Sequence, residues 1–156
     1  MWRSGRVRFT LDSNILIYAI DVATSQKHAT ALDLMERAPY ADAVLAVQAL
    51  AEFLTVIGRK YPAHSDAARA QGDRWAQSMP SVPTEWSHVS AAATFAARYR
   101  LQFWDSLIWQ VAESAGAEVF VSEDLQDGLT IDGMTVINPF NPANAEKLAR
   151  LLEPQP

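Results

Sequence analysis

The segment that decides the fold covers residues 6–14 and reads Arg6-Val7-Arg8-Phe9-Thr10-Leu11-Asp12-Ser13-Asn14. Up to Asp12 the residues alternate, with Val7, Phe9 and Leu11 facing a core and the polar residues facing away, which predicts a strand. A helical run at residues 14–20 follows directly. An acid therefore stands where a strand gives way to a helix, and ligands of open α/β sheets bind at such strand ends.

The same alternation of strands and helices continues along the chain. Further strands are expected at residues 44–47, 118–121 and 134–137, with at most a short one between Pro80 and Pro83. Further helices are expected from the second strand to near Gly58, and at residues 28–37, 65–78, 87–100, 105–115 and 143–152. This order predicts an α/β fold with a mostly parallel sheet. Because the 156 residues are 49% hydrophobic and contain no repeat or linker, we expect a single domain over residues 1–156.

The composition excludes several classes of protein. No apolar stretch approaches the roughly 18 uncharged residues that a membrane helix needs, and residues 1–10 lack the apolar region of a secretion signal. The absence of cysteine excludes disulfides, thiolate zinc sites and cysteine nucleophiles. Phosphate loops of the GxxxxGK or GxGxxG type do not occur either. We therefore expect a cytoplasmic protein with no membrane partner.

The net charge of −5 argues against a nucleic-acid partner, but only weakly. Part of the acidic excess would disappear if four of the eighteen acids were metal ligands. The basic residues are clustered in three groups: Arg3, Arg6 and Arg8; Arg59 and Lys60; Arg98 and Arg100. The sequence therefore does not decide whether these basic residues form a surface that binds phosphates.

Four acids, far apart in sequence, each lie inside or directly against a strongly apolar segment: Asp12, Glu52, Asp105 and Asp124. Apolar flanks place them near a core, where an isolated carboxylate is unfavourable. Two such charges about 4 Å apart repel by roughly 4 kcal/mol at an effective dielectric near 20, so a fold that gathers them needs protons or a multivalent cation. Hard oxygen ligands suit Mg²⁺ or Mn²⁺. If the four acids converge, the sequence predicts a metal-dependent hydrolase.

Each acid also has a simpler interpretation. Asp12 and Asp105 both precede helical runs and could be helix N-caps, although Asp105 lies on the apolar side of its helix. Asp124 could belong to a polar turn closed by Gly128. In that acidic loop, Glu123 or Asp127 could also take the place of Asp124.

The surroundings of Glu52 leave two interpretations open. Between residues 44 and 58 the only polar side chains are Gln48, Glu52 and Thr55, which fall within a stripe about 60° wide on a helix. This stripe is either an ordinary solvent-facing strip, or a narrow polar seam on a helix that is buried on its other sides. A seam of that kind could line a cleft.

The histidines and tryptophans give no separate indication of a site. His28, His64 and His88 lack metal-binding spacing and are expected on the surface or beside helices. Core packing is the expected use of the large aromatic residues Trp75, Trp86, Trp104 and Trp109. Stacking on RNA is the alternative for Trp104 and for Tyr99, which lie near the basic pair Arg98 and Arg100.

The acids and their flanking residues resemble, in this order, the PIN-domain family, and particularly the VapC-type endoribonucleases that act as toxins of toxin–antitoxin pairs. The motifs that carry the resemblance are Leu11-Asp12-Ser13-Asn14 with Ile17-Tyr18, Gln48 with Glu52-Phe53, Phe103-Trp104-Asp105-Ser106-Leu107-Ile108, Ser122-Glu123-Asp124-Leu125 and Asn138-Pro139-Phe140. They span residues 9–140 and leave 141–156 as a C-terminal helical extension, which could cap the fold or reach a partner.

The resemblance implies a three-layer fold, Mg²⁺ or Mn²⁺ held by an acidic quartet, and cleavage of RNA. By matching positions, the quartet is Asp12, Glu52, Asp105 and Asp124. Two further site residues match as well: Asn14, the family's polar residue after the first acid, and Ser122, a serine where threonine is more usual. The resemblance also implies a homodimer and a cognate antitoxin protein whose C-terminal segment blocks the acidic site with a basic side chain.

Other functions remain open on the residues alone. A DNA nuclease or a phosphohydrolase acting on small phosphates would use the same acids. A PIN-like binding module without catalysis is the third alternative.

Overall fold

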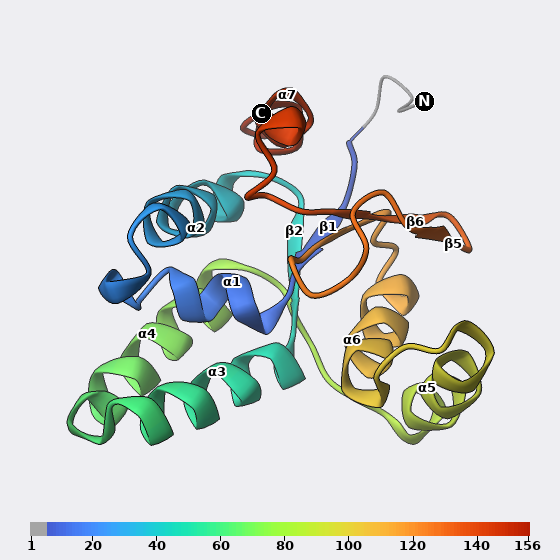
Figure 1. Ribbon diagram of the computed structural model, residues 1–156, viewed down its shortest axis with the longest axis horizontal. Helices are drawn as coiled ribbons and strands as arrows, with labels where there is room; N and C mark the ends of the chain where they lie inside the picture. The colour runs from blue at the N-terminus through green and yellow to red at the C-terminus, as the bar shows by residue number, and fades with distance from the viewer. Residues whose placement is uncertain (1–5) are drawn as a thin grey trace.

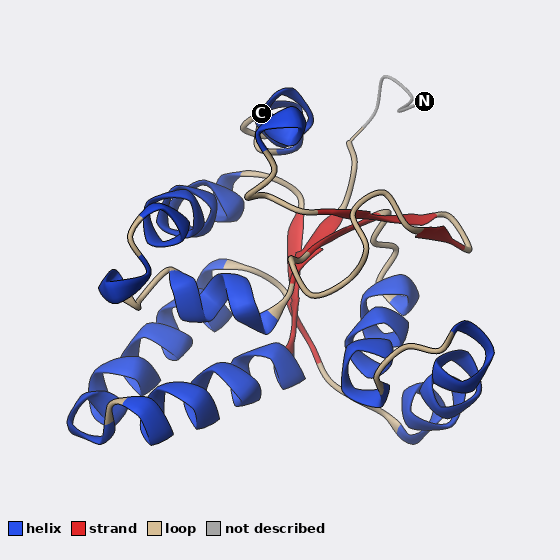
Figure 2. Ribbon diagram, in the orientation of Figure 1, coloured by secondary structure: helices blue, strands red, loops and turns tan. Residues whose placement is uncertain are grey.

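A central sheet of six strands organises the molecule, in the order β3-β2-β1-β4-β6-β5 (Figures 1 and 2). This computed structural model describes residues 6–156, so Arg3, predicted to belong to an N-terminal basic group, lies outside the described residues. The strands are β1 (Phe9–Leu11), β2 (Ala43–Ala46), β3 (Ser81–Val82), β4 (Val119–Val121), β5 (Thr130–Ile131) and β6 (Met134–Ile137). All neighbouring strands pair in parallel except β5 with β6. The predicted mostly parallel α/β sheet is confirmed.

Helices cover both faces of the sheet and complete three layers. The helices are α1 (Ser13–Tyr18), α2 (Gln26–Arg37), α3 (Val47–Lys60), α4 (Ser65–Ser78), α5 (Trp86–Tyr99), α6 (Phe103–Ser114) and α7 (Ala145–Leu151). Figure 1 shows α1 to α4 on one side and the antiparallel pair α5 and α6 on the other. Short 3₁₀ turns connect some of these elements: η1 (Val22–Thr24), η2 (Ala38–Tyr40), η3 (Pro62–His64) and η4 (Pro142–Asn144). None of the helices in residues 6–156 is long and apolar enough to cross a membrane.

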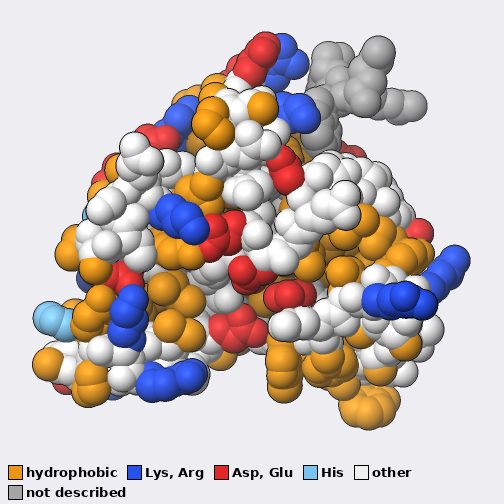
Figure 3. Space-filling view, in the orientation of Figure 1, with side chains coloured by type: hydrophobic (Ala, Val, Ile, Leu, Met, Phe, Trp, Pro, Cys, Tyr) orange, Lys and Arg blue, Asp and Glu red, His pale blue; other side chains and the backbone are white. Residues whose placement is uncertain are grey.

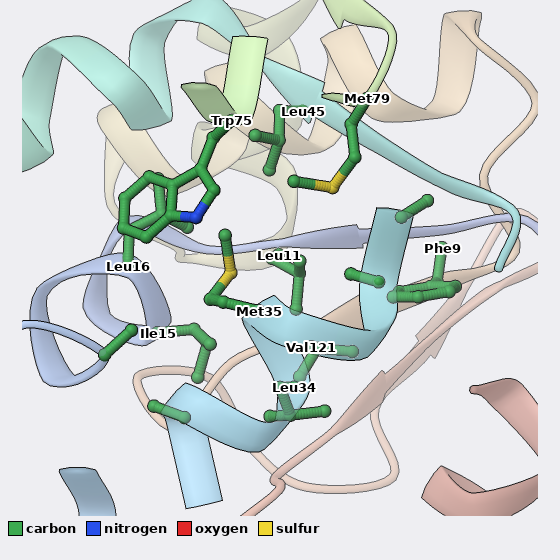
Figure 4. Close-up of a cluster of buried hydrophobic side chains, with 14 of the residues drawn as sticks. Phe9, Leu11, Ile15, Leu16, Leu34, Met35, Leu45, Trp75, Met79 and Val121 are labelled. Carbon is green, nitrogen blue, oxygen red and sulfur yellow. The ribbon is translucent and has the colours of Figure 1, made fainter. Parts of the chain in front are cut away.

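The central strands are buried on both faces. Phe9 and Leu11 of β1 pack with Val121 of β4 against α1 and α2 (Figure 4), while Phe120 packs on the opposite face against α6. Thr10 was expected to face away from the core, but it is fully buried and its hydroxyl donates to the carbonyl of Val44 at 2.8 Å. Because helices cover both faces of a parallel sheet, alternation along β1 does not mark a solvent face.

Most predicted elements agree with the structure within a few residues, and α4 agrees to the residue. One strand was not predicted: β5 lies in a segment expected to be a loop. It pairs with β6 through the two-residue turn Asp132-Gly133, in which both residues have positive φ, 49° and 84°. This backbone is a type I′ hairpin turn, for which Asp-Gly is a favoured sequence.

The C-terminal extension packs on the fold. The helix expected at residues 143–152 is divided into η4 and the shorter α7, and the side chain of Asn141 caps η4 by accepting from the amide of Ala143 at 3.1 Å. Leu148 and Leu152 belong to the hydrophobic core on the α2 side of the sheet. The amide of Gln155 donates to the carbonyl of Tyr40 at 2.7 Å. The extension therefore caps the fold.

Candidate metal centre

Two neighbouring parallel strands place the first and last acids together. Leu11 of β1 pairs with Val121 of β4, and the amide of Asp12 donates to the carbonyl of Val121 at 3.0 Å. Asp12 and Asp124 therefore both follow strands that end at the same edge of the sheet. Ligands of open α/β folds bind at this carboxyl edge.

The helix α6 brings the third acid to this edge. Asp105 was expected to begin its helix, but α6 begins two residues earlier and Gln102 holds the N-cap position. Asp105 thus lies in the first turn. One carboxylate oxygen each from Asp12, Asp105 and Asp124 lie within 4.8 Å of one another. We call these three residues the carboxylate cluster; acidic side chains gather in the middle of the face shown in Figure 3.

Hydrogen bonds fix the most buried member of the cluster. Asp12 is both the N-cap of α1 and a cluster residue: its Oδ1 accepts from the amide of Ser13 at 2.7 Å. Its Oδ2 accepts from the hydroxyl of Ser122 at 2.7 Å and from Nδ2 of Asn14 at 3.4 Å. The Ser122 hydroxyl oxygen also accepts from the amide of Asp124 at 3.1 Å. Ser122 and Asn14 therefore hold two cluster residues in place.

The pKa values of two cluster residues show how unfavourable their negative charges are. Burial raises the pKa of Asp12 to about 7, against the lowering effect of the Ser122 hydrogen bond, and the charges of Asp105 and Asp124 add to the rise. Burial also raises the pKa of Asp105 to about 6, with further contributions from Asp124 and Glu52. No lysine or arginine forms an ion pair with the cluster within residues 6–156. Protons or a cation must relieve this repulsion.

Glu52 lies beside the cluster but is not one of the three carboxylates that approach within 4.8 Å. It accepts a hydrogen bond from Nε2 of Gln48 at 3.0 Å, four residues earlier on α3, and its charge contributes to the raised pKa of Asp105. Of the two interpretations left open for the polar stripe of α3, the helix buried on its other sides is excluded, since α3 also exposes the apolar side chains of Val47 and Leu54. Glu52 therefore lies beside the cluster on a partly exposed helix.

The neighbouring acids Glu123 and Asp127 have partners elsewhere. Glu123 accepts hydrogen bonds from the hydroxyl of Tyr18 and, at 2.7 Å, from Nζ of Lys27. Asp127 accepts hydrogen bonds of 2.8–3.0 Å from the Asn138 amide and from the side chains of Asn141 and Asn144. Burial acts to raise the pKa of Asp127, but these hydrogen bonds outweigh it and hold the pKa below its ordinary value. Of the three candidate acids in this loop, only Asp124 joins the cluster.

Replacing Asp127 with alanine is expected to lower the free energy of unfolding by about 1–2 kcal/mol, because several charge-assisted hydrogen bonds are lost at a partly exposed position. Urea denaturation measures this loss. The rise in melting temperature on adding Mn²⁺ should remain as large as in the unmodified protein. A variant that keeps its stability but loses the response to Mn²⁺ would instead make Asp127 a ligand.

A buried acid that the sequence did not single out, Asp21, provides the contrast. Its side chain is paired with Lys60 and accepts a hydrogen bond from the hydroxyl of Tyr61 at 2.9 Å. The hydrogen bond from Lys60 is the main reason why the pKa of Asp21 lies below its ordinary value. Asp21 therefore links the turn after α1 to the end of α3 and has a structural role. The carboxylate cluster has no such cationic partner in the described part of the chain.

The aromatic residues divide into two groups. Trp75 and Trp109 are buried, as predicted. Trp86 and Trp104 are 79% and 60% exposed, so the prediction that they pack in the core is wrong. Two histidines make hydrogen-bond contacts away from the cluster: Nδ1 of His28 lies 2.9 Å from the carbonyl oxygen of Tyr18, and Nε2 of His88 lies 3.0 Å from Oγ of Ser114.

Comparisons with known proteins agree with this architecture. The sequence matches the model of the PIN-domain family over residues 9–126. The structure is similar to VapC20 from Mycobacterium tuberculosis, described as a toxin that cleaves the sarcin–ricin loop, with a TM-score of 0.62, 18% identity, and coverage of 74% of this chain and 91% of that chain. Among curated proteins, no sequence matches this chain at a significant level.

Two solved assemblies are also similar in structure. A toxin–antitoxin complex from Klebsiella pneumoniae gives a TM-score of 0.62 at 19% identity, covering 84% of this chain and 97% of that chain. VapBC2 from Rickettsia felis, bound to a DNA fragment from its promoter, gives a TM-score of 0.59 at 15% identity, covering 85% of this chain and 98% of that chain. At such identities the likeness concerns the fold.

Proposed function

The chain belongs to the PIN-domain family, and from this membership together with the carboxylate cluster we propose that it is a Mg²⁺- or Mn²⁺-dependent endoribonuclease that hydrolyses RNA phosphodiester bonds. The observation that carries the proposal is the approach of Asp12, Asp105 and Asp124 within 4.8 Å, with no lysine or arginine of residues 6–156 paired with them. Carboxylate oxygens are the ligands that both ions prefer. The raised pKa values of Asp12 and Asp105 give a physical reason for a cation to bind there.

The residues of the site have separate roles in this proposal. Asp12, Asp105 and Asp124 hold the ion directly, and Glu52 completes the site directly or through a water. Ser122 and Asn14 keep the carboxylate of Asp12 oriented, through the hydrogen bonds described above. When bound, the ion supplies positive charge that acidifies the attacking water and stabilises the charge developing on the phosphate.

The burial of the cluster suits a large substrate. Asp12 is 1% exposed at the base of the site, Asp105 is half-buried and Asp124 is exposed. The site is therefore closed behind Asp12 and open on the side of Asp124. A phosphodiester of a long RNA chain can approach from that open side while the inner carboxylates remain shielded from water.

We extend the proposal to partners and to domain organisation. The structural likeness to a toxin–antitoxin complex and to VapBC2 supports a toxin role, in which a cognate antitoxin blocks the acidic site with a basic side chain. A homodimer belongs to the same proposal. Residues 9–140 would form the nuclease core and residues 141–156 a helical extension within one domain. The toxin role would be supported by a small DNA-binding protein that is encoded by an adjacent gene and that copurifies with this chain.

Incubation with Mg²⁺ and labelled RNA, labelled DNA or p-nitrophenyl phosphate tests the activity. We expect the RNA to be cleaved at internal phosphodiester bonds, and EDTA should abolish this cleavage. Cleavage of DNA alone would indicate a DNA nuclease, and release of p-nitrophenol alone a small-phosphate phosphohydrolase. A protein whose melting temperature rises with Mn²⁺ but which cleaves none of the three substrates would be a binding module, and the proposal of catalysis would fail.

A further inference from the structure

Trp104 is an exposed aromatic residue next in sequence to a member of the carboxylate cluster. It precedes Asp105 in the first turn of α6, and 60% of its surface is exposed. Burying a side chain of this size is favourable, so its exposure means that nothing within residues 6–156 covers it. A lone exposed apolar residue needs no explanation in general. Trp104 differs because it immediately precedes Asp105, a proposed ligand of the ion.

Two contacts fix Trp104, one at its backbone and one at its ring. Nε2 of Gln48 lies 3.4 Å from the carbonyl oxygen of Trp104 and also donates to Glu52 at 3.0 Å. The backbone of Trp104 is therefore linked to α3 through the same side chain that holds Glu52. The ring of Phe103 packs edge-on against the indole, with centroids 5.1 Å apart and an interplanar angle of 74°. These contacts restrict the indole and leave much of its surface to solvent.

Exposed apolar side chains occur on α3 near Gln48 as well. Val47, which precedes Gln48 on α3, is 43% exposed. In Figure 3, apolar side chains lie next to the acidic side chains along the lower edge of the face. An incoming RNA strand thus meets carboxylates that hold the ion and, next to them, an aromatic surface. Proteins that bind single-stranded nucleic acids stack unpaired bases on such exposed aromatic rings.

We propose that Trp104 is a positioning residue that stacks on an unpaired nucleobase next to the scissile phosphate. This inference rests on the proposed ribonuclease function. Stacking restricts the nucleotide beside the cluster and so orients the phosphodiester toward the ion. Because every base has a π-face, the contact selects single-stranded RNA over duplex without strong preference among the four bases. The competing use of the same surface is contact with another protein chain.

The test compares Trp104→Ala and Trp104→Phe with the matched control Trp86→Ala. Trp86 is 79% exposed and is the first residue of α5. Its helix contacts the far end of α6 from Trp104, because Nε2 of His88 lies 3.0 Å from Oγ of Ser114. The substrate is a labelled single-stranded RNA 12-mer that contains one cleavage point. A second 12-mer lacks the base next to that point. The measurements are KM and kcat with Mg²⁺, together with the melting temperature and the oligomeric state of each variant.

We expect Trp104→Ala to raise KM roughly 5- to 100-fold, which corresponds to the loss of one base–aromatic stack. Trp104→Phe should stay within about threefold of the unmodified protein, and it keeps the test meaningful if the alanine variant fails to fold. Trp86→Ala should not change KM. On the 12-mer that lacks the base, Trp104→Ala and the unmodified protein should have equal KM.

Other outcomes overturn the inference in distinguishable ways. If RNA is cleaved and Trp104→Ala has the same KM as Trp86→Ala, the stacking role is wrong while the ribonuclease function stands. If Trp104→Ala alters the oligomeric state, and the ratio of KM between the two 12-mers is the same as in the unmodified protein, Trp104 contacts another protein chain instead of a base. If the unmodified protein cleaves no RNA, the proposed function fails and the stacking role fails with it.

Discussion

Asp12→Asn is expected to lower the rate of RNA cleavage about a thousandfold and, at the same time, to raise the melting temperature of the metal-free protein above pH 7. The loss of activity follows because the charge stabilisation supplied by a metal ion is worth several kcal/mol, and each 1.36 kcal/mol is a factor of ten in rate. The gain in stability follows because the variant removes a buried negative charge. A residue that merely supports the fold would not show these opposite effects together.

The sign of the stability change follows from the pKa of Asp12. Burial raises this pKa from 3.8 to about 7, so between these values the native state binds more protons than the unfolded state. The free energy of unfolding of the metal-free protein therefore falls as pH rises through this window. With 1.36 kcal/mol for each unit of pKa shift, the loss approaches about 4 kcal/mol above pH 7. Asparagine cannot ionise, so the variant avoids this loss. The gain is reduced by the hydrogen bonds from Ser122 and Asn14 that the substitution disturbs.

Thermal denaturation in EDTA at pH 5 and pH 8, together with a cleavage assay in Mg²⁺, tests this prediction. Asp33→Asn is the matched control, because Asp33 is an exposed acid whose partner is Arg37 on the same helix. The control should leave both activity and the pH dependence of stability unchanged. An Asp12→Asn variant that cleaves RNA at the normal rate, or that melts below the unmodified protein at pH 8 without metal, would contradict the assignment.

The affinity for Mn²⁺ is expected to fall roughly a hundred- to a thousandfold between pH 8 and pH 5. Metal binding requires deprotonated ligands, and the pKa values of Asp12 and Asp105, about 7 and about 6, place both protonations between these pH values. Two protons must then leave before the ion binds at pH 5. Carboxylates with ordinary pKa values would be ionised at both pH values, and the affinity would hardly change.

Titration calorimetry with Mn²⁺ at pH 8 and pH 5 measures this change. Melting temperatures provide a second readout, since an ion present at about 100 times its dissociation constant stabilises the native state by roughly 2.7 kcal/mol. This corresponds to an increase of about 5–10 °C for a chain of this size. The increase should be large at pH 8, small at pH 5, and absent in Asp124→Asn. Equal affinities at the two pH values would show that the ion binds elsewhere.

The sequence was sufficient to predict the edge of the sheet at which the acids meet. Asp12 and Asp124 each follow an apolar strand, and strands that alternate with helices form parallel sheets whose carboxyl ends share one edge. The structure places β1 beside β4 and brings the two acids together with Asp105. Their roles as ligands remain a proposal.

Features that depend on side-chain packing were not predictable in the same way. The pattern of apolar residues placed Glu52 on a helix but left open whether it faced solvent or the other acids. In the structure Glu52 accepts a hydrogen bond from Gln48, which the pattern does not specify, and lies beside the cluster rather than in it. Hydrophobicity alone predicted burial of Trp104 and Trp86, because an exposed aromatic residue has no distinct sequence signal. The short β5 was missed although its turn, Asp132-Gly133, is a hairpin sequence.

Diffraction from crystals grown with Mn²⁺, recorded at a wavelength where manganese scatters anomalously, tests the central claim most directly. The account predicts one or two anomalous peaks at the carboxyl edge of β1 and β4, in contact with oxygens of Asp12, Asp105 and Asp124. Such peaks should be absent in Asp12→Asn crystals grown in the same way. Manganese bound instead at Glu123 or Asp127, or at no carboxylate near β1, would contradict the account.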